Sequence, residues 1–409
     1  MEIKSKIKKK NSVICFFIYL SILMISIFPI FGEYGDIIKD IIIWLTVIIG
    51  FIYFITKEVI LTRYIIFFGM YIIFSIISVL WSINLGGAYI RILNMIQCFL
   101  FMTVILSFCE EEDIHKCMDV YLVGVLIISV FCFIQDFSSL SIWARLGKNA
   151  FEKAGQNQIY YSCILINATM YAIYKLSQKK QKKSLYIFIV IFLILCGVLT
   201  AVRKNFIIPI IFIIVFEMLN NKNNILKLIV ISFLLVMVFI GIYKITINSF
   251  PSMSYRINSL INDISKNTKE STIGNSFSTR KWLRYKAFDL FKENPLFGVG
   301  IGQFRFYAAD YGVDMYSHNN YLEILANTGI IGFLIYYIPI FILLFKSIRG
   351  SNCLDKKINI FIAAFLISTL IMEYGQVDYY QLFYIFFIAL FSYGTKQKSI
   401  KLFISKGKS

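Results

Sequence analysis

The chain has 409 residues, of which 58% are hydrophobic and only 16% carry a charge. Because a soluble domain has about 25% charged residues, this composition excludes a soluble globular protein and predicts that lipid is the solvent for most of the chain. The formal net charge of +18 does not indicate binding to nucleic acid, because the lysines and arginines lie in short segments between apolar runs, as the orientation of membrane proteins requires.

Apolar runs near the length needed to cross a bilayer follow one another along the chain. They lie at about 13–31, 37–55, 62–81, 89–109, 118–137, 159–176, 185–202, 204–219, 225–247, 321–345, 357–374 and 378–395. The first run follows a basic N-terminus and has no small-residue cleavage site, so we expect it to be an uncleaved span. The pattern predicts an all-α polytopic membrane protein with about 12 transmembrane helices.

The basic residues indicate which side of the membrane each connecting segment faces. The run Lys-Lys-Gln-Lys-Lys at 179–183 and the five lysines from residue 396 onward fall on the same side as the basic N-terminus. The loops 32–36, 82–88 and 375–377 on the other side contain no Lys or Arg. Since Lys and Arg gather on the cytoplasmic side, we expect a cell-membrane protein with both termini in the cytoplasm.

One outer segment, 248–320, is longer and more polar than the others and divides the chain into three parts. We expect a membrane bundle of about nine spans at 1–247, an extracytoplasmic loop with catalytic elements at 248–320, and about three spans with a basic cytoplasmic tail at 321–409. Within the loop, residues 276–292 carry aromatic side chains at helical spacing, which predicts an amphipathic helix. Such a helix either rests on the membrane surface or packs over the bundle, and the sequence leaves both open.

The chain has two histidines. His115 follows an acidic run and is expected in a solvated loop. His318 lies where the long loop re-enters the membrane. A neutral imidazole can take a proton from a hydroxyl group near neutral pH, so His318 is a candidate general base, although the residue alone favours a histidine that only anchors a helix end at the interface.

Three arginines on the predicted outer side are candidates for binding an anion. Arg203 interrupts two apolar runs, and a charge at that depth is a functional hypothesis. Arg280 and Arg284 are four residues apart and share a helix face. A guanidinium group holds phosphate oxygens with a planar pair of donors, but all three side chains could instead contact lipid headgroups.

A glycine-rich stretch, Pro-Leu-Phe-Gly-Val-Gly-Ile-Gly at 295–302, follows the predicted helix. No strand precedes it, so it is not a nucleotide-binding fingerprint, and we expect a structural turn. The loop has no acidic cluster, and the 8 cysteines form neither a disulfide framework nor a spacing suited to zinc. Neither a metal nor a cofactor is expected.

Four features, in this order, resemble the bacterial O-antigen ligase and polysaccharide polymerase superfamily (Wzy/WaaL). They are Arg203 between two spans, a long outer loop whose helix begins at Arg280, the glycine-rich stretch, and the stretch from His318 to Gly332 that leads into a span. The last two are fairly specific for the family, and the layout of spans agrees over the whole chain. Upstream, Gly-Gln-Asn at 155–157 lies where family members often carry a Gly/Asn-rich stretch.

The resemblance implies an inverting, metal-independent glycosyl transfer on the extracytoplasmic face, from a glycan on undecaprenyl diphosphate to an acceptor hydroxyl. His318 would match the family's general base, and Arg203 and Arg280 would match the arginines that hold the departing diphosphate. Fixed cations of this kind stabilise a leaving diphosphate without a metal. Three further residues are implied in substrate binding: Arg284 (also an alternative to Arg280), Asn319 and Gln156.

The implied partners are the undecaprenyl-diphosphate-linked oligosaccharide and membrane lipids, together with a flippase and a chain-length regulator. A polymerase of capsule or O-antigen type is the preferred function, because the richness in Phe, Ile, Lys and Asn suggests an AT-rich genome, and many such bacteria lack the outer membrane that a ligase serves. A ligase of the same family shares the donor chemistry and stays an alternative. A flippase or transporter of lipid-linked sugars is a second alternative, but its sites would lie mid-membrane at broken helices.

Overall fold

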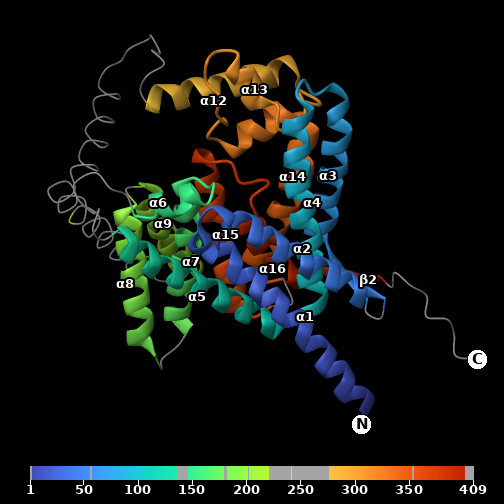
Figure 1. Ribbon diagram of the computed structural model, residues 1–409, viewed down its shortest axis with the longest axis vertical. Coiled ribbons are helices and arrows are strands. Elements are labelled where there is room, and N and C mark those ends of the chain that lie inside the picture. Colours follow the sequence, from blue (N-terminus) through green and yellow to red (C-terminus); the bar gives the residue numbers. More distant parts are fainter. Residues whose placement is uncertain are drawn as a thin grey trace, which may run out of the picture. The chain divides into compact units, whose positions relative to one another are not determined.

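The computed structural model is almost entirely helical (Figure 1). It describes residues 2–55, 58–136, 146–178, 182–200, 202–220, 241, 276–351 and 354–400. The ninth predicted span, 225–247, apart from residue 241, and the predicted outer loop up to residue 275 lie outside these residues.

Within the described residues, six helical segments are long and apolar enough to cross a membrane. They are Val13–Phe54, Arg63–Trp81, Leu85–Phe108, Glu111–Asp136, Asn320–Arg349 and Lys356–Gly375. The chain is thus a helical membrane protein, as its composition predicts. The count of twelve spans stays a prediction.

Residue contacts divide the chain into two compact units, and each is described by itself. The first unit contains residues 1–49, 108–259 and 354–368. Its elements include α1 (Glu2–Ile27), η1 (Phe28–Tyr34), most of α2 (Gly35–Phe54), α5 (Glu111–Asp136), α6 (Lys148–Lys153), α7 (Gln158–Gln178), α8 (Lys183–Leu199), α9 (Lys204–Asn220) and most of α15 (Lys356–Met372). Helix α1 packs along α5, and α7 packs against α8 and α9. Most side chains of α7 are buried, so α7 is the central helix of this unit.

The second unit contains residues 50–107, 260–353 and 369–409. Its elements include β1 (Val59–Thr62), α3 (Arg63–Ile77), η2 (Ser78–Trp81), α4 (Leu85–Phe108), α12 (Ser276–Glu293), α13 (Phe304–Ala309), α14 (Asn320–Arg349), η4 (Glu373–Gly375), α16 (Leu382–Ser392), η5 (Tyr393–Thr395) and β2 (Lys396–Ile400). Helix α14 packs against α3 and α12, and α13 joins α12 and α14. Figure 1 shows α12 and α13 lying at one end of α14.

Beside its helices the structure has one short two-stranded sheet. Strands β1 and β2 pair antiparallel, with Val59 opposite Ile400 and Leu61 opposite Lys398. Both strands belong to segments that the charge pattern assigns to the cytoplasm. A four-residue strand carries too little periodicity to be told from the end of an apolar helix, and its partner lies at the far end of the chain.

Helix α12 covers the residues where the aromatic spacing predicts a helix. Its packed face, however, is made by Leu283, Ala287 and Leu290, which join a buried core with side chains of α13 and α14. Tyr285 and Phe288, which belong to the aromatic pattern, remain 60% and 42% exposed. The pattern therefore located the helix but not the face that packs against its neighbours.

Helix α14 is interrupted at Gly329, whose φ of 62° lies in the left-handed region that glycine adopts without strain. The interruption frees two carbonyl groups at the end of the first helical segment. The amide of Val299 donates to the carbonyl of Ala326, and the amide of Gly300 donates to the carbonyl of Asn327, each at 2.9 Å. The glycine-rich stretch thus satisfies polar groups that a break in an apolar helix would leave bare.

The same stretch also satisfies the start of the second helical segment of α14. The amides of Ile330 and Ile331 donate to the carbonyls of Pro295 and Leu296, at 2.9 and 3.3 Å. The backbones come so close that a Cβ on Gly298 would lie 2.4 Å from the carbonyl carbon of Asn327. The glycine-rich stretch is therefore a structural turn that is hydrogen-bonded to both segments of the interrupted helix α14.

Candidate functional site

His318 lies in the loop that leads into α14, in the second unit. Its backbone has a φ of 56°, which is uncommon for a residue with a side chain, and only 5% of the residue is exposed. Its ring lies against the ring of Tyr316, with the centroids 4.2 Å apart. The loop therefore holds the imidazole in one defined orientation.

Hydrogen bonds from both sides fix the loop around His318. The carboxylate of Glu323, one turn into α14, accepts the amide of Ser317 at 2.7 Å. The Ser317 hydroxyl donates to the carbonyl of Asn319 and accepts its amide. The side-chain oxygen of Asn319 caps α14 by accepting the amide of Leu322 at 3.0 Å. Asn319, a predicted substrate contact, thus has a structural task in positioning His318.

Asn320 connects the His318 loop to the segment that follows η4. Its side-chain oxygen accepts the amides of Asp378 and Tyr379, at 2.9 and 3.2 Å. Its side-chain nitrogen donates to the hydroxyl of Tyr337 at 2.9 Å, and this hydroxyl donates to the carboxylate of Glu373 at 2.7 Å. All of these residues are buried. Sequence analysis missed this network, since all its members except Asn320 lie in segments that read only as apolar spans.

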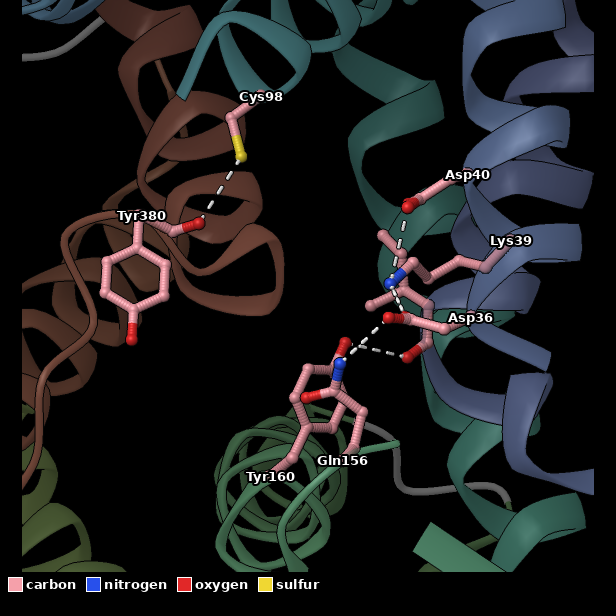
Figure 2. Close-up of polar contacts among 8 residues, drawn as sticks. Asp36, Lys39, Asp40, Cys98, Gln156, Tyr160 and Tyr380 are labelled. Carbon is pink, nitrogen blue, oxygen red and sulfur yellow. Dashed lines mark hydrogen bonds and ion pairs between the residues drawn. The ribbon is translucent and has the colours of Figure 1, made fainter. Parts of the chain in front are cut away.

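Arg91 in α4 also reaches this region. The carbon of its guanidinium group lies 3.7 Å from the ring centroid of Tyr380, which is the geometry of a cation–π contact. Figure 2 shows Tyr380 and the contact of its carbonyl with the Cys98 thiol, 3.9 Å away, which ties the same segment to α4. The sequence offered one signal for Arg91, a charge inside a predicted span.

The predicted arginines of α12 lie at the edge of this region. Arg280 is exposed, and its carbonyl accepts a hydrogen bond from the Arg284 side chain at 3.2 Å. The guanidinium group of Arg284 lies over the ring of Tyr374, 5.2 Å from the centroid. Of the two, Arg284 therefore contacts the segment that carries η4.

Asp314, which precedes His318, is engaged elsewhere. Its carboxylate forms a paired contact with the guanidinium group of Arg305, at 2.8 and 2.9 Å. The hydrogen bond from Arg305 holds the pKa of the Asp314 carboxyl below its ordinary value. The pair is largely exposed, so it braces the loop at the surface rather than orienting the imidazole.

Arg203 and Gln156 belong to the first unit. Arg203 is exposed in the turn between α8 and α9. The buried side chain of Asn205 stabilises this turn. Its nitrogen donates to the Thr200 hydroxyl at 2.6 Å and to the Gly197 carbonyl at 3.2 Å. Arg203 thus lies in a turn that hydrogen bonds hold together, and its part beside a diphosphate stays a prediction.

The side-chain amide of Gln156 has a partner within the first unit. Its nitrogen donates to the carboxylate of Asp36 at 3.1 Å, as Figure 2 shows. The same carboxylate pairs with Lys39, whose ammonium group also lies 3.6 Å from Asp40. Gln156 therefore joins two segments that both read as outer loops, and its role in substrate binding stays a prediction.

Among the residues that the structure describes, no three His, Cys, Asp or Glu side chains are grouped closely enough to hold a metal ion. The polar side chains that surround His318 are a carboxylate, amides and phenols, with guanidinium groups at the edge. Such a set can orient a base and hold an anion.

Comparison with known proteins finds one family that part of the chain resembles. Residues 187–337 match the family model described as O-antigen ligase. The match begins in α8, ends within α14 and contains Arg203, Arg280, Arg284 and His318. No curated protein matches the chain. Residues 187–337 are therefore similar to the O-antigen ligase family, which supports the superfamily that the four motifs predict.

Proposed function

We propose that the protein is a polysaccharide polymerase of capsule or O-antigen type. It transfers a growing glycan from an undecaprenyl-diphosphate-linked donor to a hydroxyl group of the next lipid-linked repeat unit. The observation that carries this proposal is His318, which is buried in a loop held by hydrogen bonds at the start of α14, within the segment that matches the family.

The proposed reaction needs a base and a stabilised leaving group. His318 takes the proton of the acceptor hydroxyl, and the acceptor oxygen forms a bond to the anomeric carbon of the donor sugar. The bond from that carbon to the diphosphate oxygen breaks on the opposite side, so the configuration inverts. Arg203 and Arg280 stabilise the negative charge on the departing diphosphate, which makes a metal unnecessary.

The contacts support the proposed placement of the site outside the cell. Asn84 and Gln303, from two segments that read as extracytoplasmic, exchange hydrogen bonds at 2.7 and 2.9 Å. Lys175 and Asp119, near segments that read as cytoplasmic, pair at 2.7 Å. Each pair joins segments that the charge pattern assigns to the same side, as the proposed topology with cytoplasmic termini and an extracytoplasmic His318 requires.

The test is an assay of the purified protein with a lipid-diphosphate-linked repeat unit, in the presence of EDTA, with products separated on a gel. We expect a ladder of products from the wild-type protein and none from His318→Ala. The matched control is His115→Ala, which removes the other histidine and should leave the ladder unchanged. A normal ladder from His318→Ala would refute the assigned role of the base.

The same assay separates the alternatives. Transfer of glycan only to an added unrelated acceptor would identify a ligase, which uses the same donor chemistry. Failure to transfer to any acceptor, together with movement of the lipid-linked sugar across a vesicle membrane, would identify a flippase or transporter.

A further inference from the structure

Arg91 is a cation that no motif singles out, yet it lies beside the His318 loop. Its guanidinium group stacks on Tyr380, 3.7 Å from the ring centroid. Tyr380 directly follows Tyr379, whose amide is bonded to the side chain of Asn320 at 3.2 Å. Since Asn320 is two residues after His318, one short set of contacts connects Arg91 with the candidate base.

The stem of Arg91 runs through a space that only glycine leaves open. A Cβ on Gly302 would lie 2.8 Å from the Cγ of Arg91. The next residue, Gln303, is fully buried and holds this turn in place by hydrogen bonds to the backbone of Asn84, just before α4. The side chain of Arg91 is therefore held on one side by the glycine-rich turn and on the other by the Tyr380 ring.

The hydrogen-bond donors of the Arg91 guanidinium group are not occupied by the part of the protein that the structure describes. Over the described residues, no carboxylate lies within 4.0 Å of Arg91 and none of its nitrogens donates a hydrogen bond, whereas the donors of Arg305 are occupied by Asp314. A charged side chain inside a membrane-spanning helix costs free energy and is therefore a functional hypothesis. A bound oxyanion would neutralise the charge of Arg91 and accept hydrogen bonds from its planar pair of donors.

We propose that Arg91 is a substrate-binding residue that holds a phosphate oxygen of the lipid-diphosphate donor in the His318 site. The identity of this anion rests on the proposed function, but the anion site itself does not. Tyr380 acts as a positioning residue, because its ring fixes the plane of the guanidinium group.

The first experiment measures binding of inorganic pyrophosphate to the full-length purified protein by calorimetry. Arg91→Gln should raise the dissociation constant about 10- to 100-fold, the range expected for a charge-assisted hydrogen bond. Arg91→Lys, which keeps the charge and is the variant to use if Arg91→Gln does not fold, should lose part of the affinity, because an ammonium group lacks the paired donors. The matched control is Arg305→Gln, which should bind as the wild type does.

Tyr380 supplies a second test of the geometry. Tyr380→Phe keeps the ring face and should leave the dissociation constant unchanged, whereas Tyr380→Leu should raise it. Wild-type affinity in both Arg91→Gln and Arg91→Lys would overturn the proposal and leave Arg91 a structural contact of Tyr380.

Two further arms identify the source of the phosphate. In the transfer assay, Arg91→Lys should raise the KM for the lipid-linked donor more than it lowers kcat. Loss of pyrophosphate binding in phosphatidylglycerol nanodiscs but not in phosphatidylcholine nanodiscs would overturn the assignment to the donor, because a bulk headgroup would then occupy Arg91.

His318→Ala should abolish transfer and keep pyrophosphate binding. If the wild-type protein binds pyrophosphate through Arg91 but transfers no glycan, the proposed function fails while the anion site stands.

Discussion

Gly329 and Leu296 meet backbone to backbone at the break in α14. A Cβ on Gly329 would lie 2.3 Å from the carbonyl oxygen of Leu296, and this carbonyl accepts the amide of Ile331 at 3.3 Å. The first helical segment of α14, which His318 precedes, is thus joined to the membrane-spanning segment through the glycine-rich turn. The position of the candidate base depends on this crossing.

Gly329→Ala should therefore destabilise the protein more than its backbone angle alone explains. A side chain in the left-handed region costs about 1–3 kcal/mol, and the clash with Leu296 adds to it. The control is Gly350→Ala, because Gly350 has a φ of 64° and open space around its Cβ position. Thermal unfolding in detergent measures both variants. Equal losses in melting temperature would show that the contact with Leu296 contributes nothing.

Tyr337→Phe should loosen the start of α14. The substitution removes the hydroxyl that links Asn320 to Glu373 and leaves the buried Glu373 carboxylate without this donor, at an expected cost of about 1–3 kcal/mol. The neighbouring Tyr336 is the control, because its buried hydroxyl has no hydrogen-bond partner in the described part of the chain. Thermal unfolding and the transfer assay should both decline for Tyr337→Phe and stay unchanged for Tyr336→Phe. The opposite order would contradict the assigned network.

Asp314→Asn should leave glycan transfer within about twofold of wild type, because an exposed ion pair contributes little to stability and its carboxylate is engaged with Arg305. The pKa of Asp314 is held low by Arg305 in the folded protein. The small stabilisation from this pair is accordingly present at neutral pH and is lost as the pH falls from the unfolded value through the folded pKa. Melting temperatures between pH 3 and 7 check this, with about pH 4 as the ordinary value for Asp. A large loss of activity in Asp314→Asn would instead indicate that Asp314 orients His318.

Arg203→Lys should impair turnover of the lipid-diphosphate donor at least about tenfold, because an ammonium group cannot reproduce the paired contact of a guanidinium group with phosphate. The fold should be unaffected, since Arg203 is exposed at the turn before α9. Lys204→Arg is the control: it alters the adjacent cation and keeps the charge. Initial rates of donor consumption measure the effect, and wild-type rates in Arg203→Lys would exclude Arg203 from the diphosphate site.

The sequence by itself determined the class of protein and most helix positions, and its motifs indicated the superfamily. These features are local: an apolar run long enough to span a bilayer is a helix wherever it stands, since the backbone must satisfy its own hydrogen bonds in lipid. The order of Arg203, Arg280, the glycine-rich stretch and His318 was likewise readable along the chain, and residues 187–337 match the family.

Only the tertiary structure decided which segments meet. The two backbone amides bonded to the side chain of Asn320 lie 58 and 59 residues away, and Arg91 reaches Tyr380 from a helix far earlier in the chain. The aromatic spacing of α12 gave its helical form but not its packed face, which Leu283, Ala287 and Leu290 supply. Periodicity reports what each residue's neighbours in sequence require, whereas contacts across the fold depend on how side chains and backbone groups fit once the helices pack.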